Sequence, residues 1–198
     1  MSQPLPRPMS LDDFFAWQAT QEVRYELVGG VPLRMVVGIT NRHDRIVINL
    51  IIALGTKLRG SDCVPFTGES AFETYPGQIR RPDVGVDCGK RDPSAYKATE
   101  PRLVVEVMSP STRDFDTIEK VEEYKAVGSL EHILSVEPNW PEVILWSRDA
   151  ERSWLKRRFG ELDATVDLPA IGTELVLPEI YEGIPFPPAP RLAFERNS

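Results

Sequence analysis

Cysteine and histidine are scarce in this sequence, with two of each among 198 residues. Cys63 and Cys88 lack the CxxC spacing of a metal or dithiol motif, and two histidines cannot complete a typical zinc ligand set. The sequence therefore argues against a structural zinc site. We expect both cysteines to be buried free thiols.

The sequence also lacks an excess of basic residues. It has 23 Lys and Arg residues and 30 Asp and Glu residues, which give a formal net charge of −7. This balance argues against a protein that coats nucleic acid non-specifically, which would be basic. It does not argue against a nuclease, because a metal ion held by carboxylates and a few arginines can bind phosphate locally.

Long apolar runs are absent as well. No run reaches the ~18 residues that a membrane span requires, and the start, MSQPLPRPMS, has no apolar segment typical of a signal peptide. We expect a cytoplasmic protein without membrane contact. The length suits one domain, residues 1–198, and a composition with 41% hydrophobic and 27% charged residues is that of a globular protein.

Hydrophobic periodicity predicts two helices and a hairpin in the first third of the chain. Ser10 is a suitable N-cap for a helix over residues 10–20, and Gly29-Gly30 separates two strand-like runs. The strongest helical stripe covers residues 41–59. The proline-rich segment from Leu177 onward is expected to be an irregular tail.

The second half of the chain alternates between strand and helix patterns. Apolar runs precede and follow a helical segment at residues 116–127, so LVVEVM and HILSVE should form a βαβ unit with parallel, neighbouring strands. Two further strands, EVILWS and SWLKRRF, follow. We predict an α/β domain with a central mixed sheet flanked by helices.

Two acids occupy positions in strand-like apolar runs where core residues are expected. They are Asp83 in RPDVGV and Glu106 in LVVEVM. A carboxylate in such a strand is usually paired, metal-bound or catalytic. If the two converge, they form an all-oxygen site that leaves positions for water and phosphate, which suits Mg²⁺.

A metal-dependent hydrolase also needs a cationic group near the developing negative charge. Met108 occupies the position two residues after Glu106 and cannot supply it. Lys120, on the following helix, could reach back over the strand end, and Tyr124 shares its helix face at i+4.

Together these segments resemble the Uma-type endonuclease family, catalogued as a domain of unknown function within the PD-(D/E)xK restriction-endonuclease-like superfamily. The resemblance rests on YELVGG, RPDVGV, LVVEVMSPSTRDFD, and Lys120 with Tyr124, and spans about residues 9–182. It implies a restriction-endonuclease-like core with Asp83 and Glu106 as ligands of Mg²⁺ or Mn²⁺. It also implies that the lysine has moved from position 108 to Lys120. Residues 183–198 are then a proline-rich tail.

Each of these residues also has a structural interpretation. Asp83 could pair with Arg80 or Arg81, and Lys120 could be a solvated lysine among helix glutamates. Three further residues are weaker candidates for the site, each with a structural alternative. Glu26 could instead pair with Arg24 or Arg34, His43 could be a packed or capping residue, and Tyr124 could lie at the core edge and orient Lys120.

The sequence thus leads to two hypotheses. The first is a Mg²⁺- or Mn²⁺-dependent endonuclease that cleaves phosphodiester bonds of DNA. The second is a nuclease fold that has lost catalysis and serves as a binding or assembly module, as Met108 and the acidic charge balance suggest. The hairpin and apolar helices also suggest a homodimer.

Overall fold

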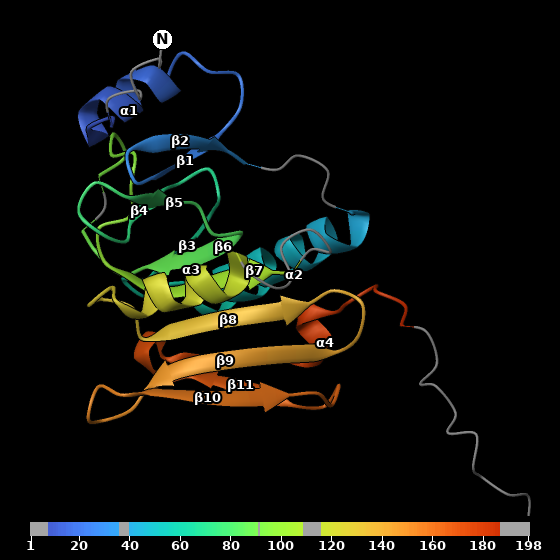
Figure 1. Ribbon diagram of the computed structural model, residues 1–198. Coiled ribbons are helices and arrows are strands. Elements are labelled where there is room, and N and C mark those ends of the chain that lie inside the picture. Colours follow the sequence, from blue (N-terminus) through green and yellow to red (C-terminus); the bar gives the residue numbers. More distant parts are fainter. Residues whose placement is uncertain (1–7, 36–39, 91, 109–115, 187–198) are drawn as a thin grey trace, which may run out of the picture.

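The computed structural model describes residues 8–35, 40–90, 92–108 and 116–186, with only the backbone described for residues 116–118. Two predicted features therefore lie outside the described residues: most of the SPSTRDFD loop, and the tail beyond residue 186. Figure 1 shows the arrangement of the elements. In chain order they are α1 (Leu11–Gln18), β1 (Tyr25–Val28), β2 (Val31–Arg34), α2 (Asn41–Lys57), β3 (Val64–Thr67), β4 (Phe72–Glu73), β5 (Ile79–Arg80), β6 (Val84–Asp87), β7 (Pro101–Val107), α3 (Asp116–Lys125), β8 (His132–Glu137), β9 (Glu142–Arg148), β10 (Trp154–Phe159), β11 (Thr165–Leu168), a 3₁₀ turn (Pro169–Ile171), β12 (Thr173–Val176) and α4 (Leu177–Ile180).

A six-stranded sheet forms the centre of the molecule, in the order β10-β9-β8-β7-β6-β3. β7 and β8 run parallel, with Glu106 opposite Ser135, whereas the other neighbouring pairs are antiparallel. The predicted βαβ unit and mixed sheet are confirmed. A smaller sheet, β2-β1-β5-β4, and the β11–β12 pair complete the strands.

Helices cover both faces of the central sheet. Leu103, Val105 and Val107 of β7 belong to the larger core cluster, which also contains apolar residues of α2, α4, β11 and β12. Val104 belongs to a second cluster, where Val121 and Tyr124 of α3 pack. Alternate β7 residues point to opposite faces, so Glu106 lies on the α3 side. None of the helices in the described ranges is long and apolar enough to cross a bilayer.

The N-terminal elements form where the sequence predicts them. The Ser10 hydroxyl accepts a hydrogen bond from the amide of Asp13 at the start of α1, and Gly29 and Gly30 have φ values of 58° and 78° in the β1–β2 turn. Residues that have a Cβ atom rarely adopt such positive φ values, so this hairpin depends on its glycine pair.

The segment that begins at Leu177 differs from its prediction. It opens with α4 rather than an irregular tail, and Leu177, Ile180 and Tyr181 are buried in the larger core cluster. The Tyr181 hydroxyl donates to the backbone carbonyl of Glu142, which ties this segment to β9. Pro178 is compatible with the helix because the first helical positions need no intrahelical N–H bond.

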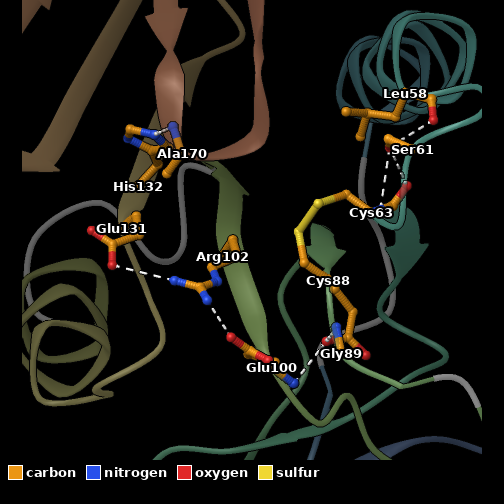
Figure 2. The surroundings of a disulfide bond; sticks show 11 residues. Leu58, Ser61, Cys63, Cys88, Gly89, Glu100, Arg102, Glu131, His132 and Ala170 are labelled. Atoms are coloured by element: carbon orange, nitrogen blue, oxygen red, sulfur yellow. Dashed lines mark hydrogen bonds and ion pairs between the residues drawn. A yellow bond between two sulfur atoms is a disulfide. The ribbon is translucent and has the colours of Figure 1, made fainter.

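The prediction of free thiols is wrong, because Cys63 and Cys88 form a disulfide (Figure 2). β3 and β6 pair antiparallel with Val64 opposite Asp87, so the two cysteines are the next pair along this ladder. Their proximity depends on strand register between segments separated by 25 positions, which no local pattern reveals.

Removing this disulfide is expected to destabilise the fold. A cross-link over a loop of 25 residues contributes about 3.5 kcal/mol by restricting the unfolded chain. Urea unfolding of the oxidised protein should therefore show a higher midpoint than unfolding in dithiothreitol. The Cys63→Ser variant should match the reduced protein in both buffers. Identical midpoints for oxidised and reduced wild type would contradict this expectation.

Candidate functional site

Asp83 and Glu106 lie side by side at one edge of the central sheet. Val84 pairs with Val105 in the antiparallel β6–β7 ladder, so the next position brings Asp83 opposite Glu106. β6 begins at Val84, and Asp83 is therefore the residue just before the strand. Its Oδ2 accepts a hydrogen bond of 2.7 Å from the Val107 amide, which fixes the carboxylate against β7.

Glu106 lies in a mostly buried position beneath α3. Its side chain is 15% exposed, and its Oε1 accepts a hydrogen bond from the Tyr124 hydroxyl. Burial raises the pKa of Glu106 to about 7, and the nearby Asp83 carboxylate adds to this rise while Lys120 opposes it. The Tyr124 ring is itself fully buried, so the hydroxyl that orients Glu106 is held in place by packing.

Lys120 points inward toward Glu106. Its Nζ lies 3.2 Å from Oε1 of Glu26 and 3.5 Å from Oε1 of Glu106, and its side chain is 21% exposed. Burial lowers the pKa of Lys120, but the two carboxylates outweigh burial and raise it above the usual value, so the amine stays an ammonium. The alternative of a solvated helix lysine does not describe this side chain.

Glu26 reaches the site from the β1–β2 hairpin but has partners other than those predicted. Its Oε2 accepts a 2.9 Å hydrogen bond from Nη1 of Arg80, and its Oε1 accepts one of 3.1 Å from the Arg81 amide. Arg24, by contrast, pairs with Glu69. The alternative pairing of Glu26 with Arg24 or Arg34 does not form, because Glu26 points into the interior, where it is 8% exposed.

Arg80 joins Glu26 to a second buried acid that sequence reasoning missed. Its Nη2 lies 2.6 Å from Oε2 of Glu123, and the same carboxylate accepts a hydrogen bond from the Thr74 hydroxyl. Glu123 follows Lys120 by three positions, a spacing that places both on one side of α3. This spacing could have indicated that Glu123 lies on the same side of α3 as Lys120. It could not have identified Arg80 as the ion-pair partner of Glu123.

His43 contacts Asp83 from the first turn of α2. Its Nε2 lies 3.3 Å from Oδ2 of Asp83, and its side chain is 5% exposed. Burial lowers the pKa of His43, but the Asp83 carboxylate outweighs burial and raises it. The structure thus brings His43 together with the predicted acids. It also pairs Asp83 with His43, not with Arg80 or Arg81 as the structural alternative proposed.

The charges in this site do not balance. Four carboxylates, Asp83, Glu106, Glu26 and Glu123, face the two cations Lys120 and Arg80. With all four ionised and His43 neutral, the site would carry two negative charges in excess, and the raised pKa values of Glu106 and His43 mean that protons offset part of this excess when no other cation is bound. Such an excess, built from carboxylates in a mostly buried place, is what a divalent cation would compensate.

The donor atoms suit a hard cation such as Mg²⁺. Among the described residues, the hydrogen bonds to these carboxylates use Oδ2 of Asp83 and Oε1 of Glu106, which leaves the second oxygen of each carboxylate for a cation. Within the described ranges, no cluster of three or more His, Cys, Asp or Glu side chains is arranged to hold a metal ion by itself. Water and substrate oxygens would have to complete the coordination, an arrangement that Mg²⁺ commonly adopts.

Comparisons with known proteins agree on a family and a fold. Residues 11–179 match the sequence model of the Uma2 family, described as "Putative restriction endonuclease". Uncharacterized protein slr1290 of Synechocystis is 30% identical over 187 residues, which cover 93% of this chain and 97% of that protein. The crystal structure of "a putative nuclease belonging to DUF820" from Anabaena variabilis superposes with a TM-score of 0.69 at 17% identity, covering 87% of this chain and 97% of that one. At this identity the superposition shows a shared fold.

Proposed function

The chain belongs to the Uma2 family, and from this membership we propose that it is a metal-dependent endonuclease that hydrolyses phosphodiester bonds of DNA. The main support is the position of Asp83, just before β6, beside Glu106 on the adjacent strand β7, with the Lys120 ammonium 3.5 Å from Glu106. This combination of two carboxylates and a cation is what phosphodiester hydrolysis requires near the reacting phosphorus.

Asp83 and Glu106 would hold Mg²⁺ or Mn²⁺, which when bound polarises the phosphate and lowers the pKa of a water molecule. Lys120 would donate a hydrogen bond to the attacking water or to a non-bridging phosphate oxygen, where negative charge develops. Its Nζ is preorganised for this role by Glu26 and Glu106, so little reorientation is needed when substrate arrives.

The remaining side chains would support these three. His43 contacts Asp83 and the Tyr124 hydroxyl donates to Glu106, so each carboxylate is oriented by a buried neighbour. Arg80 holds Glu26 in place and thereby holds the partner of Lys120. The Asp83 and Glu106 side chains are 24% and 15% exposed, so water would screen their interaction with a cation less than on an open surface.

Plasmid nicking tests the proposed activity. The wild type should convert supercoiled plasmid to open-circular and linear forms in Mg²⁺ or Mn²⁺ but not in EDTA, and Asp83→Ala should be inactive. Asp87→Asn is a matched control, because Asp87 lies at the other end of β6 and accepts hydrogen bonds from the Gly89 and Glu100 amides. Equal activity of wild type and Asp83→Ala, or no activity with any divalent metal, would contradict the proposal.

A second candidate function is a binding or assembly module without catalysis. Met108 favours it, because the residue two positions after the strand acid is the usual place for the lysine of this superfamily. A metal titration distinguishes the metal-dependent nuclease from the non-catalytic module. A ligand that binds only the native state raises the melting temperature once it exceeds its Kd, so a module without a metal site should melt at the same temperature with and without Mn²⁺.

A further inference from the structure

The central sheet has a second polar surface beyond α3, on strands β9 and β10. Strand pairing places Arg148 opposite Trp154, Trp146 opposite Lys156, and Ile144 opposite Arg158. Alternate residues of a strand point to the same side, so these six side chains share one face of the sheet. We call them the β9–β10 face. In Figure 1, α3 lies over β7 and alongside β8, while β9 and β10 extend beyond it.

The β9–β10 face is on the same side of the sheet as the catalytic acids. Four residues lie opposite one another in a row across the strands β7, β8, β9 and β10: Glu106, Ser135, Ile144 and Arg158. Strands in a sheet are about 4.8 Å apart, so Arg158 lies about 14 Å from Glu106 along this row. One extended ligand could therefore contact both regions.

Cations lie against aromatic rings on this face. The Lys125 and Lys156 ammonium groups are 5.9 Å and 5.3 Å from the centre of the Trp146 ring. The Arg148 guanidinium is 4.4 Å from the centre of the Trp154 ring. Indole rings hold these cations near the surface through cation–π attraction without neutralising their charge.

The β9–β10 face and the adjoining end of α3 are positively charged, whereas the whole chain is negative. Their carboxylates pair with only some of their cations, since Arg158 pairs with Glu142 and Lys125 with Glu122. Lys156 has no ion-pair partner among the described residues. The turn between β9 and β10 carries Asp149, Glu151 and Arg152 and lies outside this face. On the face itself, and from α3 beside it, four cations outnumber the two acids that pair with them: Lys125, Arg148, Lys156 and Arg158 against Glu122 and Glu142. The region is thus locally positive in a chain of net charge −7.

The Arg148 guanidinium accounts for part of this excess. It donates hydrogen bonds to the backbone carbonyls of Leu130, Arg152, Lys125 and Val127 rather than to a carboxylate. Its position is therefore fixed, and among the described residues no carboxylate forms an ion pair with it, although Glu131 lies near enough to act on its charge. A fixed cation without an ion-pair partner, beside an aromatic ring, favours an anionic ligand.

We propose that the β9–β10 face binds the phosphate backbone of the nucleic acid on one side of the cleaved bond. The proposal rests on the endonuclease function above and names the surface that would hold its substrate. Phosphates follow one another at about 3.4 Å of axial rise per strand, so the 14 Å row corresponds to about four nucleotides. Trp146 supplies an aromatic surface of the kind that accompanies basic side chains at nucleic-acid sites.

Two charge reversals on neighbouring residues of β10 test this assignment. Lys156 belongs to the β9–β10 face, whereas Arg157 points to the opposite face and lines a cavity of about 880 Å³ with His132 and Ser147. Both are exposed, so Lys156→Glu and Arg157→Glu change the net charge equally. Binding of a fluorescein-labelled DNA duplex is measured by anisotropy in EDTA over a series of salt concentrations, so that hydrolysis does not interfere.

Lys156→Glu is expected to weaken binding on the order of tenfold and to reduce the slope of log K against log salt by about 1, because one phosphate contact is lost. Arg157→Glu should keep the wild-type slope. Circular dichroism melting of both variants checks that the fold is intact.

Each other outcome overturns the assignment. Equal losses in both variants would mean that net charge alone governs binding, and an unchanged Lys156→Glu affinity would mean that the substrate contacts another surface. Concentration-dependent self-association that Lys156→Glu abolishes, without an effect on DNA, would make this face a contact between protein copies.

The binding assay is independent of the proposed catalysis. Plasmid cleavage by a wild type whose DNA affinity is insensitive to Lys156→Glu would refute the surface and leave the nuclease function standing. A protein that cleaves no DNA in Mg²⁺ or Mn²⁺ could still bind DNA with a salt slope that falls in Lys156→Glu. That result would support the β9–β10 face as a DNA-binding surface and refute the nuclease function.

Discussion

The Glu106→Gln variant is expected to show no metal-dependent cleavage above background. Glutamine keeps an oxygen that can accept the hydrogen bond from the Tyr124 hydroxyl, so packing beneath α3 should survive. It removes one of the two negative charges that would hold the metal, and a neutral amide is a much poorer ligand for Mg²⁺.

Differential scanning fluorimetry with Mn²⁺ checks this result apart from catalysis. A metal at a hundred times its Kd stabilises the native state by about 2.7 kcal/mol, so the wild-type melting temperature should rise and that of Glu106→Gln should not. Glu100→Gln is the matched control, since Glu100 precedes the opposite end of β7 and pairs with Arg102. A variant that still responds to Mn²⁺ like wild type would exclude Glu106 as a ligand.

Replacing Lys120 by methionine should lower kcat on the order of 10²–10³-fold, the usual effect of removing a group that stabilises transition-state charge. Mn²⁺ should still raise the melting temperature of this variant, because Asp83 and Glu106 remain. Single-turnover plasmid cleavage measures the rate. Lys120→Arg should not restore it, because a planar guanidinium cannot replace a compact ammonium between Glu26 and Glu106.

Lys125→Met provides the control on the same helix. Lys125 pairs with Glu122 and lies on the side of α3 that faces Trp146, away from the acids. Its replacement should change KM and leave kcat near the wild-type value. If Lys120→Met cleaved as fast as wild type, the helix lysine would have a structural role, and the displaced-lysine account would be wrong.

Local patterns were enough to predict most of the core elements. The apolar runs LVVEVM and HILSVE on either side of a helical segment predicted parallel, neighbouring strands, and the helical stripe over residues 41–59 predicted α2. The unusual acids drew attention to Asp83 and Glu106, and strand adjacency brought them together. These features depend on short-range periodicity, which the sequence displays directly.

Features that depend on long-range register could not be predicted. The Cys63–Cys88 disulfide follows from the pairing of β3 with β6, and the contact between Arg80 and Glu123 follows from the packing of the small sheet against α3. The prolines after Leu177 dominate the local composition and indicate a tail. Its burial instead depends on the core cluster that it shares with residues of α2, β11 and β12, which no pattern around Leu177 reveals.

The buried charges also show why Lys120 was hard to assign from sequence. Glu119, Glu122 and Glu123 surround it along α3, and such spacing is typical of a solvated helix face. In the fold, Glu122 is exposed whereas Glu123 is buried against Arg80. The inward position of Lys120 therefore depends on carboxylates supplied by β1 and β7, which are distant in sequence.

Anomalous diffraction from a crystal soaked in Mn²⁺ would locate the metal independently of any activity. We expect a strong anomalous peak between the carboxylates of Asp83 and Glu106, with Lys120 Nζ nearby, and no peak at that position in Asp83→Ala. Absence of a peak there under conditions that saturate the melting response, or a peak held by other residues, would contradict the assignment of Asp83 and Glu106 as the metal site.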